Sequence, residues 1–176
     1  SIDSVVAARY PREKLEILVV DDGSTDDTWL HIEAAAQRHA GLVTPIRFPK
    51  NRGKRAGLEA GFRQARGEIV VTIDSDSVIE ADTLLAMAGA FRNPEVGAVA
   101  GKVTIYNKRG LIPRMLKVQF ILAFDFQRAT QSTYDTVFCC PGALAGYRLS
   151  VVHEVLDEWM QQTFLGVPAP TAKTAR

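Results

Sequence analysis

Two clusters of aspartates directly follow apolar runs, and their carboxylates are the groups in this chain best suited to chemistry. Asp21-Asp22 follow the run at 16–20, and Asp74-Ser75-Asp76 follow the run at 68–73. Both runs are short and rich in β-branched residues, which is typical of buried strands. Ligands of open parallel sheets bind beyond the carboxyl ends of the strands. If the two strands are neighbours, several carboxylates share one mouth, which is costly unless a cation or a hydrogen-bonding ligand satisfies them.

Asp74 and Asp76 have the chemistry of a divalent-cation site. Alternate side chains at a strand end point the same way, so both carboxylates can face one ligand. Their oxygens suit Mg²⁺ or Mn²⁺, and Mg²⁺ typically takes one or two carboxylates and completes its shell from a substrate diphosphate. The alternative is a pair of aspartates that cap the next helix. The apolar strand before them and the second acidic strand end favour the metal.

Asp21 and Asp22 are candidates for recognition of a nucleobase. A carboxylate accepts the imide N–H of uracil, a donor that few other base edges offer. Capping of the following helix is the alternative role, but Ser24 and the aspartates at 26–27 already supply it. Asp21 and Asp22 therefore remain less explained by local structure.

A basic loop at 49–55 lies between the two clusters and contains Lys54 and Arg55. These two cations could neutralise phosphates or contact a base, although a solvated basic surface is an equally good explanation. The other basic residues are dispersed and the net charge is +1, so nothing indicates nucleic acid as a partner.

The composition indicates one globular domain in a reducing compartment. The chain has 176 residues, of which 47% are hydrophobic and 23% charged. Its only cysteines, Cys139 and Cys140, are adjacent and poorly placed to pair with each other, which favours the cytosol. No signal peptide and no apolar run of about 18 residues occurs. Because the chain opens at Ser1 without methionine, we interpret it as a fragment.

Strand and helix patterns alternate along the chain. Strands are predicted at 16–20, 43–48, 68–73, 96–105 and 136–140, and helices at 1–8, 24–39, 56–65, 80–91, 110–131 and 149–160. This order implies an α/β sandwich with a mostly parallel sheet, in one domain over 1–176. The apolar face of 110–131 favours a packed core or interface helix over a membrane-surface helix.

The motifs resemble those of family 2 glycosyltransferases, and their order matches the family's. The segment 19–28 resembles the first motif of the family, and 72–77 resembles its metal-binding Asp-x-Asp. The loop at 51–58 is similar to that of the processive members. The segments 127–132 and 139–148 are similar to hyaluronan synthases, chitin synthases and the chitin-oligosaccharide synthases of nodulation.

This resemblance implies a GT-A fold, a UDP-sugar donor and inversion at the anomeric carbon. The sugar would be of the N-acetylglucosamine type and the acceptor a growing β-linked polysaccharide. Transfer would take place at the cytosolic face of the inner or plasma membrane, on transmembrane helices outside this domain. The resemblance implies uridine contacts from Asp21 or Asp22 and from Lys54, with Arg55 beside them, and it places Asp74 near the ribose and diphosphate.

The resemblance also assigns a metal side and an acceptor side. Asp76, together with Asp74, would hold Mg²⁺ or Mn²⁺, which would stabilise charge on the departing diphosphate. Cys140, Pro141 and Gly142 would lie near the acceptor sugar.

The sequence departs from the family pattern at both ends, so we expect an incomplete GT-A domain. The family opens with a strand that is absent here. It also supplies its general base from a Gly-Glu-Asp-Arg-like motif after a Phe-Leu-Gly stretch. Phe164-Leu165-Gly166 is present, yet no Asp or Glu follows Glu158. One hypothesis is that 169–176 is a frameshifted end, which sequencing of the coding DNA would test.

Three other functions stay open. The chain could belong to a non-processive family 2 transferase with a lipid or protein acceptor. It could instead be a UDP-sugar-binding fragment without catalytic activity. A nucleotidyltransferase is a weaker alternative, because it shares the scaffold and the metal carboxylates but not the ordered motifs.

Overall fold

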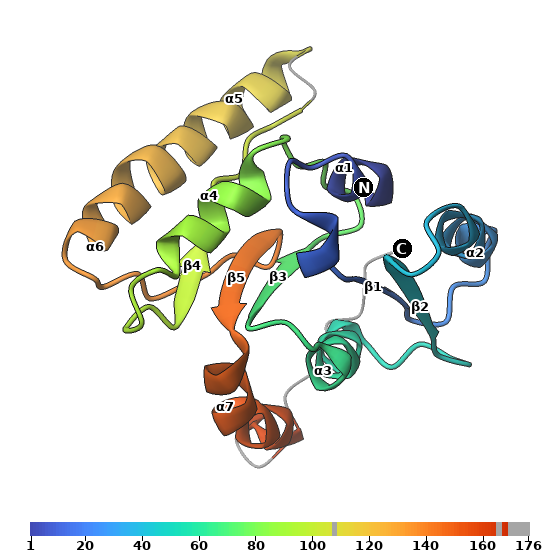
Figure 1. Cartoon of the computed structure of the whole chain (residues 1–176). Helices are drawn as coiled ribbons and strands as arrows, with labels where there is room; N and C mark the ends of the chain where they lie inside the picture. Colours follow the sequence, from blue (N-terminus) through green and yellow to red (C-terminus); the bar gives the residue numbers. More distant parts are fainter. Residues whose placement is uncertain (107–108, 165–166, 169–176) are drawn as a thin grey trace.

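The computed structural model of the chain describes residues 1–106, 109–164 and 167–168. The first half alternates helices and strands as predicted: α1 (Ile2–Val6), η1 (Arg12–Lys14), β1 (Ile17–Asp21), α2 (Thr28–Arg38), β2 (Val43–Arg47), α3 (Lys54–Gln64), β3 (Ile69–Ile73), α4 (Thr83–Ala90) and β4 (Ala98–Ala100) (Figure 1). The second half contains α5 (Leu111–Phe120), a π-helix η2 (Ile121–Arg128), α6 (Ala129–Thr133), β5 (Leu144–Arg148), α7 (Leu149–Gln161), β6 (Thr163–Phe164) and β7 (Val167–Pro168). The tail at 169–176, the subject of the frameshift hypothesis, lies outside the described residues.

The strand pair β1–β2 is parallel and brings two charged strand ends together. Its register runs from Ile17 opposite Val43 to Asp21 opposite Arg47. Pro45 lies within β2, which fits an edge strand, since proline cannot donate to a ladder. The register places the last residue of each strand at the same edge of the pair.

A second sheet is antiparallel, with the order β3-β5-β4, and β6 and β7 form a separate antiparallel pair. The strand directions are therefore mixed where a mostly parallel sheet was expected. The predicted strand at 136–140 is wrong, because the central strand is instead β5 at Leu144–Arg148. Ala145 is fully buried there. A Cβ on Gly146 would lie only 3.1 Å from the Phe91 ring and 3.2 Å from Met87 Cε. Small residues are needed at this crowded position, and that packing outweighs the higher strand propensity of 136–140.

The core has two clusters on opposite faces of β3 and β5. Val71 and Ile73 of β3 pack against a cluster of buried residues that comprises Val5, Ile79, Leu84, Met87 and Leu144. Val70 packs against the other cluster, formed by Phe62, Val152 and Leu156 of α3 and α7. Neighbouring β3 residues thus face opposite layers, as the strand period requires. The expected α/β sandwich is confirmed in this arrangement (Figure 1).

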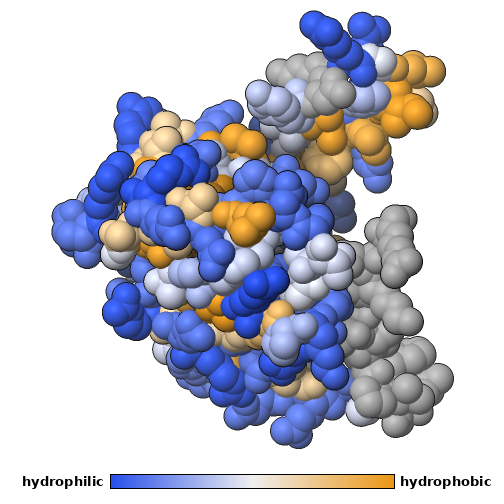
Figure 2. Space-filling model, turned by 90° about the vertical axis from the view of Figure 1, so that its right-hand side faces the viewer, coloured by the Kyte–Doolittle hydropathy of each residue, from blue (hydrophilic) through white to orange (hydrophobic). Residues whose placement is uncertain are grey.

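The segment α5–η2–α6 forms one long rod that stands apart from the sheets (Figure 1). Its apolar residues are exposed rather than packed, with Leu111, Ile112, Met115, Val118, Leu122 and Phe126 each between 58% and 73% accessible. Figure 2 shows apolar side chains gathered on the projecting lobe. The prediction of a packed core helix is therefore wrong within the described residues, because nothing described there covers this face, and an interface helix stays a prediction. In the same part of the chain, no helix has both the length and the apolarity to cross a membrane.

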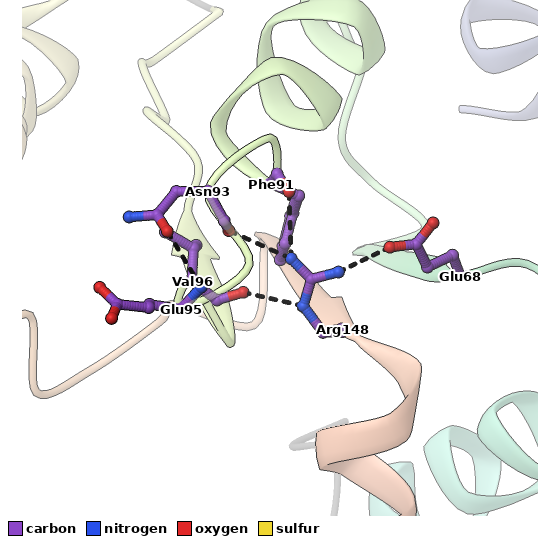
Figure 3. A network of polar contacts seen from close by, with 6 residues as sticks. All are labelled: Glu68, Phe91, Asn93, Glu95, Val96 and Arg148. Carbon is purple, nitrogen blue, oxygen red and sulfur yellow. Dashed lines mark hydrogen bonds and ion pairs between the residues drawn. The ribbon is translucent and has the colours of Figure 1, made fainter.

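Arg148 joins β5 to the segment between α4 and β4 (Figure 3). Its guanidinium donates to the carbonyl oxygens of Val96 at 3.2 Å, Phe91 at 3.0 Å and Asn93 at 3.2 Å, and it pairs with Glu68 at 2.6 Å. The side chain is only 15% exposed. A planar group with several fixed donors is needed for this set of acceptors, and lysine cannot reproduce it.

We expect Arg148→Lys to lower the free energy of unfolding by about 2 kcal/mol, because carbonyl oxygens lose charged donors in a mostly buried place. Urea denaturation measures the change. Arg12→Lys, at an exposed arginine of η1, is the matched control and should leave the midpoint unchanged. Equal midpoints for both variants would contradict the assigned role of Arg148.

Candidate nucleotide and metal site

Asp22 fastens the basic loop to the end of β1. Its carboxylate accepts the backbone N–H of Arg52 at 2.7 Å and that of Gly53 at 2.8 Å. Gly53 is the N-cap residue of α3. Asp22 therefore anchors the two residues that precede α3 from a distant point of the sequence, and its negative charge lies near the positive end of the helix dipole.

Gly23 lets the two segments approach closely. It has φ of +73°, and a Cβ at this position would lie 2.5 Å from the carbonyl carbon of Lys50. Both the backbone conformation and the contact exclude other residues. The turn after β1 and the loop before α3 thus form one fixed unit.

Asp21 is a buried carboxylate with one oxygen that lacks a hydrogen bond. The residue is 2% exposed, and its Oδ1 accepts the backbone N–H of Ser24 at 3.0 Å. Its Oδ2 has no hydrogen-bond partner, although Arg47 Nε lies 3.4 Å away as an ion-pair partner. Arg47 itself lies over the Trp29 ring, 4.8 Å from the centroid. Such an incompletely satisfied buried group is costly, which makes Asp21 a candidate functional residue.

A shallow hollow of about 380 Å³ lies beyond the carboxyl ends of β1 and β2. Its lining includes Ser24 and Arg47, the two residues that contact Asp21, together with Gly23, Phe48 and Pro49. This is the position at which an α/β sheet binds a ligand. Sequence analysis missed Arg47, although both strands end in a charged residue and the parallel register places these two residues opposite each other.

Lys54, Asp74 and Gly142 meet at a second point. Lys54 Nζ forms an ion pair with Asp74 Oδ1. The backbone N–H of Asp74 donates to the carbonyl of Ala143 at 3.3 Å. A Cβ on Gly142 would lie 3.2 Å from Lys54 Nζ. Residues from the start of α3, the end of β3 and the turn before β5 are thereby brought into contact.

The two aspartate clusters are connected through this unit and not through strand pairing. In the described part of the chain, β1 and β3 belong to different sheets. The connection instead runs from Asp22 to the backbone of Gly53, along the chain to Lys54, and from Lys54 to Asp74. The other proposed nucleotide contact, Arg55, lies over the Trp159 ring of α7 at 5.3 Å.

Asp74 and Asp76 offer oxygen ligands that fit Mg²⁺ or Mn²⁺. Asp76 is exposed and has no ion pair or side-chain hydrogen bond to another described residue. No group of three or more His, Cys, Asp or Glu side chains in the described ranges could enclose a metal ion. A cation at these two carboxylates would therefore take its remaining ligands from water and from a diphosphate, which is the usual arrangement for Mg²⁺.

In the segment 139–142, expected beside the acceptor sugar, Cys140 is poorly suited to act as a nucleophile. Burial raises the pKa of the Cys140 thiol, as does the neighbouring Cys139, while Arg128 lowers it less. The thiol stays protonated and unreactive at neutral pH. Pro141 and Gly142 form the turn that leads into β5, and Gly142 leaves room for the Lys54 ammonium.

The chain belongs to glycosyl transferase family 2, whose sequence profile matches residues 1–156. It is 34% identical, over 96% of its length, to an N-acetylglucosaminyltransferase of Azorhizobium caulinodans. It is also 36% identical, over 94% of its length, to one of Rhizobium meliloti. The chain spans 42% and 39% of these two relatives.

Solved structures confirm the GT-A fold that the motifs implied. The mannosyltransferase PcManGT of Pyrobaculum calidifontis, in complex with GDP-Man and Mn²⁺, superimposes with a TM-score of 0.69. It is 30% identical, and the match covers 88% of this chain and 41% of that one. TarS 1–349 of S. aureus, in complex with UDP-GlcNAc, gives a TM-score of 0.60 at 22% identity, and the match covers 87% and 42% of the two chains. At this lower identity the likeness concerns the fold alone.

We expect Asp22→Ala to loosen the start of α3. Two N–H groups lose a charged acceptor, so the free energy of unfolding should fall by about 1–2 kcal/mol. Hydrogen exchange measured by NMR should show faster exchange of the Arg52 and Gly53 amides. Glu13→Ala, at an exposed carboxylate that forms no ion pair with any described residue, is the control. Equal protection of the two amides in wild type and Asp22→Ala would refute the anchoring role.

Proposed function

We propose that this chain binds the donor of a family 2 glycosyltransferase, a UDP-sugar of the N-acetylglucosamine type. Residues 1–176 form part of one GT-A domain in this proposal. The single observation that carries it is the buried Asp21 carboxylate with one unsatisfied oxygen, which contacts Ser24 and Arg47 in the lining of the hollow beyond β1 and β2. The names of the bacterial relatives support the sugar.

Asp21 is the proposed base reader, and Asp22 is a positioning residue. The imide N–H of uracil would donate to Asp21 Oδ2, and Arg47 would move aside from that oxygen. Asp22 already uses both oxygens on the backbone of Arg52 and Gly53. From the sequence, either aspartate could contact the uridine. Asp21 is favoured because one of its oxygens lacks a hydrogen bond, whereas both oxygens of Asp22 are occupied.

The diphosphate would lie between the start of α3 and the end of β3. Lys54 would neutralise part of its charge and Arg55 would add a second cation, while Asp74 and Asp76 would hold the divalent ion. The complex of PcManGT with Mn²⁺ supports such an ion. When bound, the cation stabilises negative charge on the departing diphosphate.

The acceptor would approach from Cys140, Pro141 and Gly142. This turn contacts Lys54 through Gly142 and Asp74 through the neighbouring Ala143. Donor and acceptor would therefore meet at one place, which positions the attacking hydroxyl near the anomeric carbon. We further propose that the whole protein extends a β-linked polysaccharide with inversion, at the cytosolic face of a membrane that it contacts through helices outside this chain.

Isothermal titration of the 176-residue chain with UDP, with and without Mn²⁺, tests the donor site. We expect Mn²⁺ to strengthen UDP binding by about tenfold or more, and Asp76→Ala to abolish that gain, since a carboxylate ligand of the ion is lost. UDP affinity that responds neither to the ion nor to the substitution would exclude this function. Glu80→Ala, an exposed carboxylate on the same segment, serves as the control.

Asp21→Asn separates recognition from stability. The amide keeps the shape and an acceptor oxygen, but it turns a donor toward the imide N–H. We expect UDP binding to fall by about tenfold while the free energy of unfolding changes by less than about 1 kcal/mol, because the buried charge is itself costly. Calorimetry and urea denaturation measure the two effects, and undiminished UDP affinity would contradict the proposed contact.

A further inference from the structure

The ion pair between Lys54 and Asp74 places a cation on an expected metal ligand. The ammonium contacts Asp74 Oδ1, while Asp76 has no such partner among the described residues. The side chains are 47% and 33% exposed, so water reaches both of them. A pair of this kind is weak and can be exchanged for a better partner.

The backbone of Lys54 is held in place, whereas its ammonium group has room to move. Its backbone starts α3 directly after Gly53, whose N–H is held by Asp22. Its ammonium extends over Gly142, where the absent side chain leaves space. The tip can therefore move a short way without any change in the fold.

We propose that Lys54 is an internal counter-ion of Asp74 that is released when donor and cation bind together. This inference rests on the proposed function and adds a coupling between its two ligands. In the empty site Lys54 stabilises the charge of Asp74 and competes with a divalent cation for it. An arriving diphosphate offers Lys54 a stronger, doubly charged partner, which frees Asp74 for the cation.

This exchange penalises a cation that binds without nucleotide. Mn²⁺ alone must displace the ammonium and leave it unpaired beside a second positive ion. Mn²⁺ with UDP meets no such cost, because the diphosphate takes over Lys54. The site would therefore bind its metal ion more tightly when the donor is present than when it is absent.

Lys54→Met tests the exchange, since it removes the charge and keeps most of the aliphatic stem. Binding of Mn²⁺ alone, measured by water proton relaxation, should become about fivefold tighter than in wild type. Binding of UDP in saturating Mn²⁺, measured by calorimetry, should become about tenfold weaker. These opposite shifts are specific to an exchange, because a purely structural role of Lys54 would weaken both ligands.

Lys50→Met is the matched control. It removes a lysine from the same loop, and Lys50 is exposed and forms no ion pair with any described residue. We expect its fold-change in affinity for Mn²⁺ alone to be less than half of the fold-change caused by Lys54→Met. Circular dichroism melting checks that both variants fold, and Lys54→Gln is the second variant if Lys54→Met is unstable.

Three outcomes would overturn the proposal. They differ in whether the proposed donor and metal site is refuted as well. Equal Mn²⁺ affinity of wild type and Lys54→Met, with Mn²⁺-dependent UDP binding intact, refutes the exchange and leaves the donor site standing. If Lys50→Met binds Mn²⁺ alone as tightly as Lys54→Met does, the effect comes from the overall positive charge of the loop. That result also refutes the exchange. Absence of Mn²⁺ binding from every variant, with and without UDP, removes the metal site and the exchange with it.

Discussion

The carboxylate of Asp22 joins the end of β1 to the start of α3, and the geometry of the site follows from this join. Two hydrogen bonds to the backbone of residues 52–53 fix where the helix begins. Gly23 permits the contact, because any side chain there would collide with Lys50. Since Lys54 is the first residue of α3, its reach to Asp74 is set by the same join. We expect the two hydrogen bonds to this charged acceptor to contribute about 1–2 kcal/mol together, which offsets part of the conformational entropy of the loop.

Neighbouring aspartates have opposite relations to stability. Asp22 has both oxygens satisfied and supports the fold, whereas Asp21 is buried with one oxygen short of a hydrogen bond. An unsatisfied buried group costs about 1–3 kcal/mol. A ligand donor that reaches Asp21 would recover that cost on binding, so the site would be preorganised at the expense of the empty protein. At the second cluster Asp74 is paired with Lys54, whereas Asp76 is exposed to water and therefore carries no such cost.

The sequence was a good guide wherever a short segment determines its own structure. The runs before Asp21 and Asp74 are β1 and β3, and the aspartates lie at their carboxyl ends as predicted. The ordered motifs also led to the correct family and fold. What failed depends on contacts between distant segments. In β5, Gly146 fits closely against Phe91, although Ala145 and Gly146 have little strand propensity. The partners of Asp22, Lys54 and Arg47 could not be predicted either, because no local sequence pattern indicates which distant backbone group or carboxylate a side chain will contact.

The position of the Asp22 carboxylate at the start of α3 has a consequence for how an anion would be held. A helix start offers roughly half a positive charge to a phosphate. At α3 a full negative charge already lies there, since Asp22 accepts the N–H of Gly53. The diphosphate of the proposed donor would consequently rely more on side-chain cations and a metal ion than on the helix dipole. Dissolved salt screens charges that are in contact with water, so affinity for the donor would fall as the ionic strength of the medium rises.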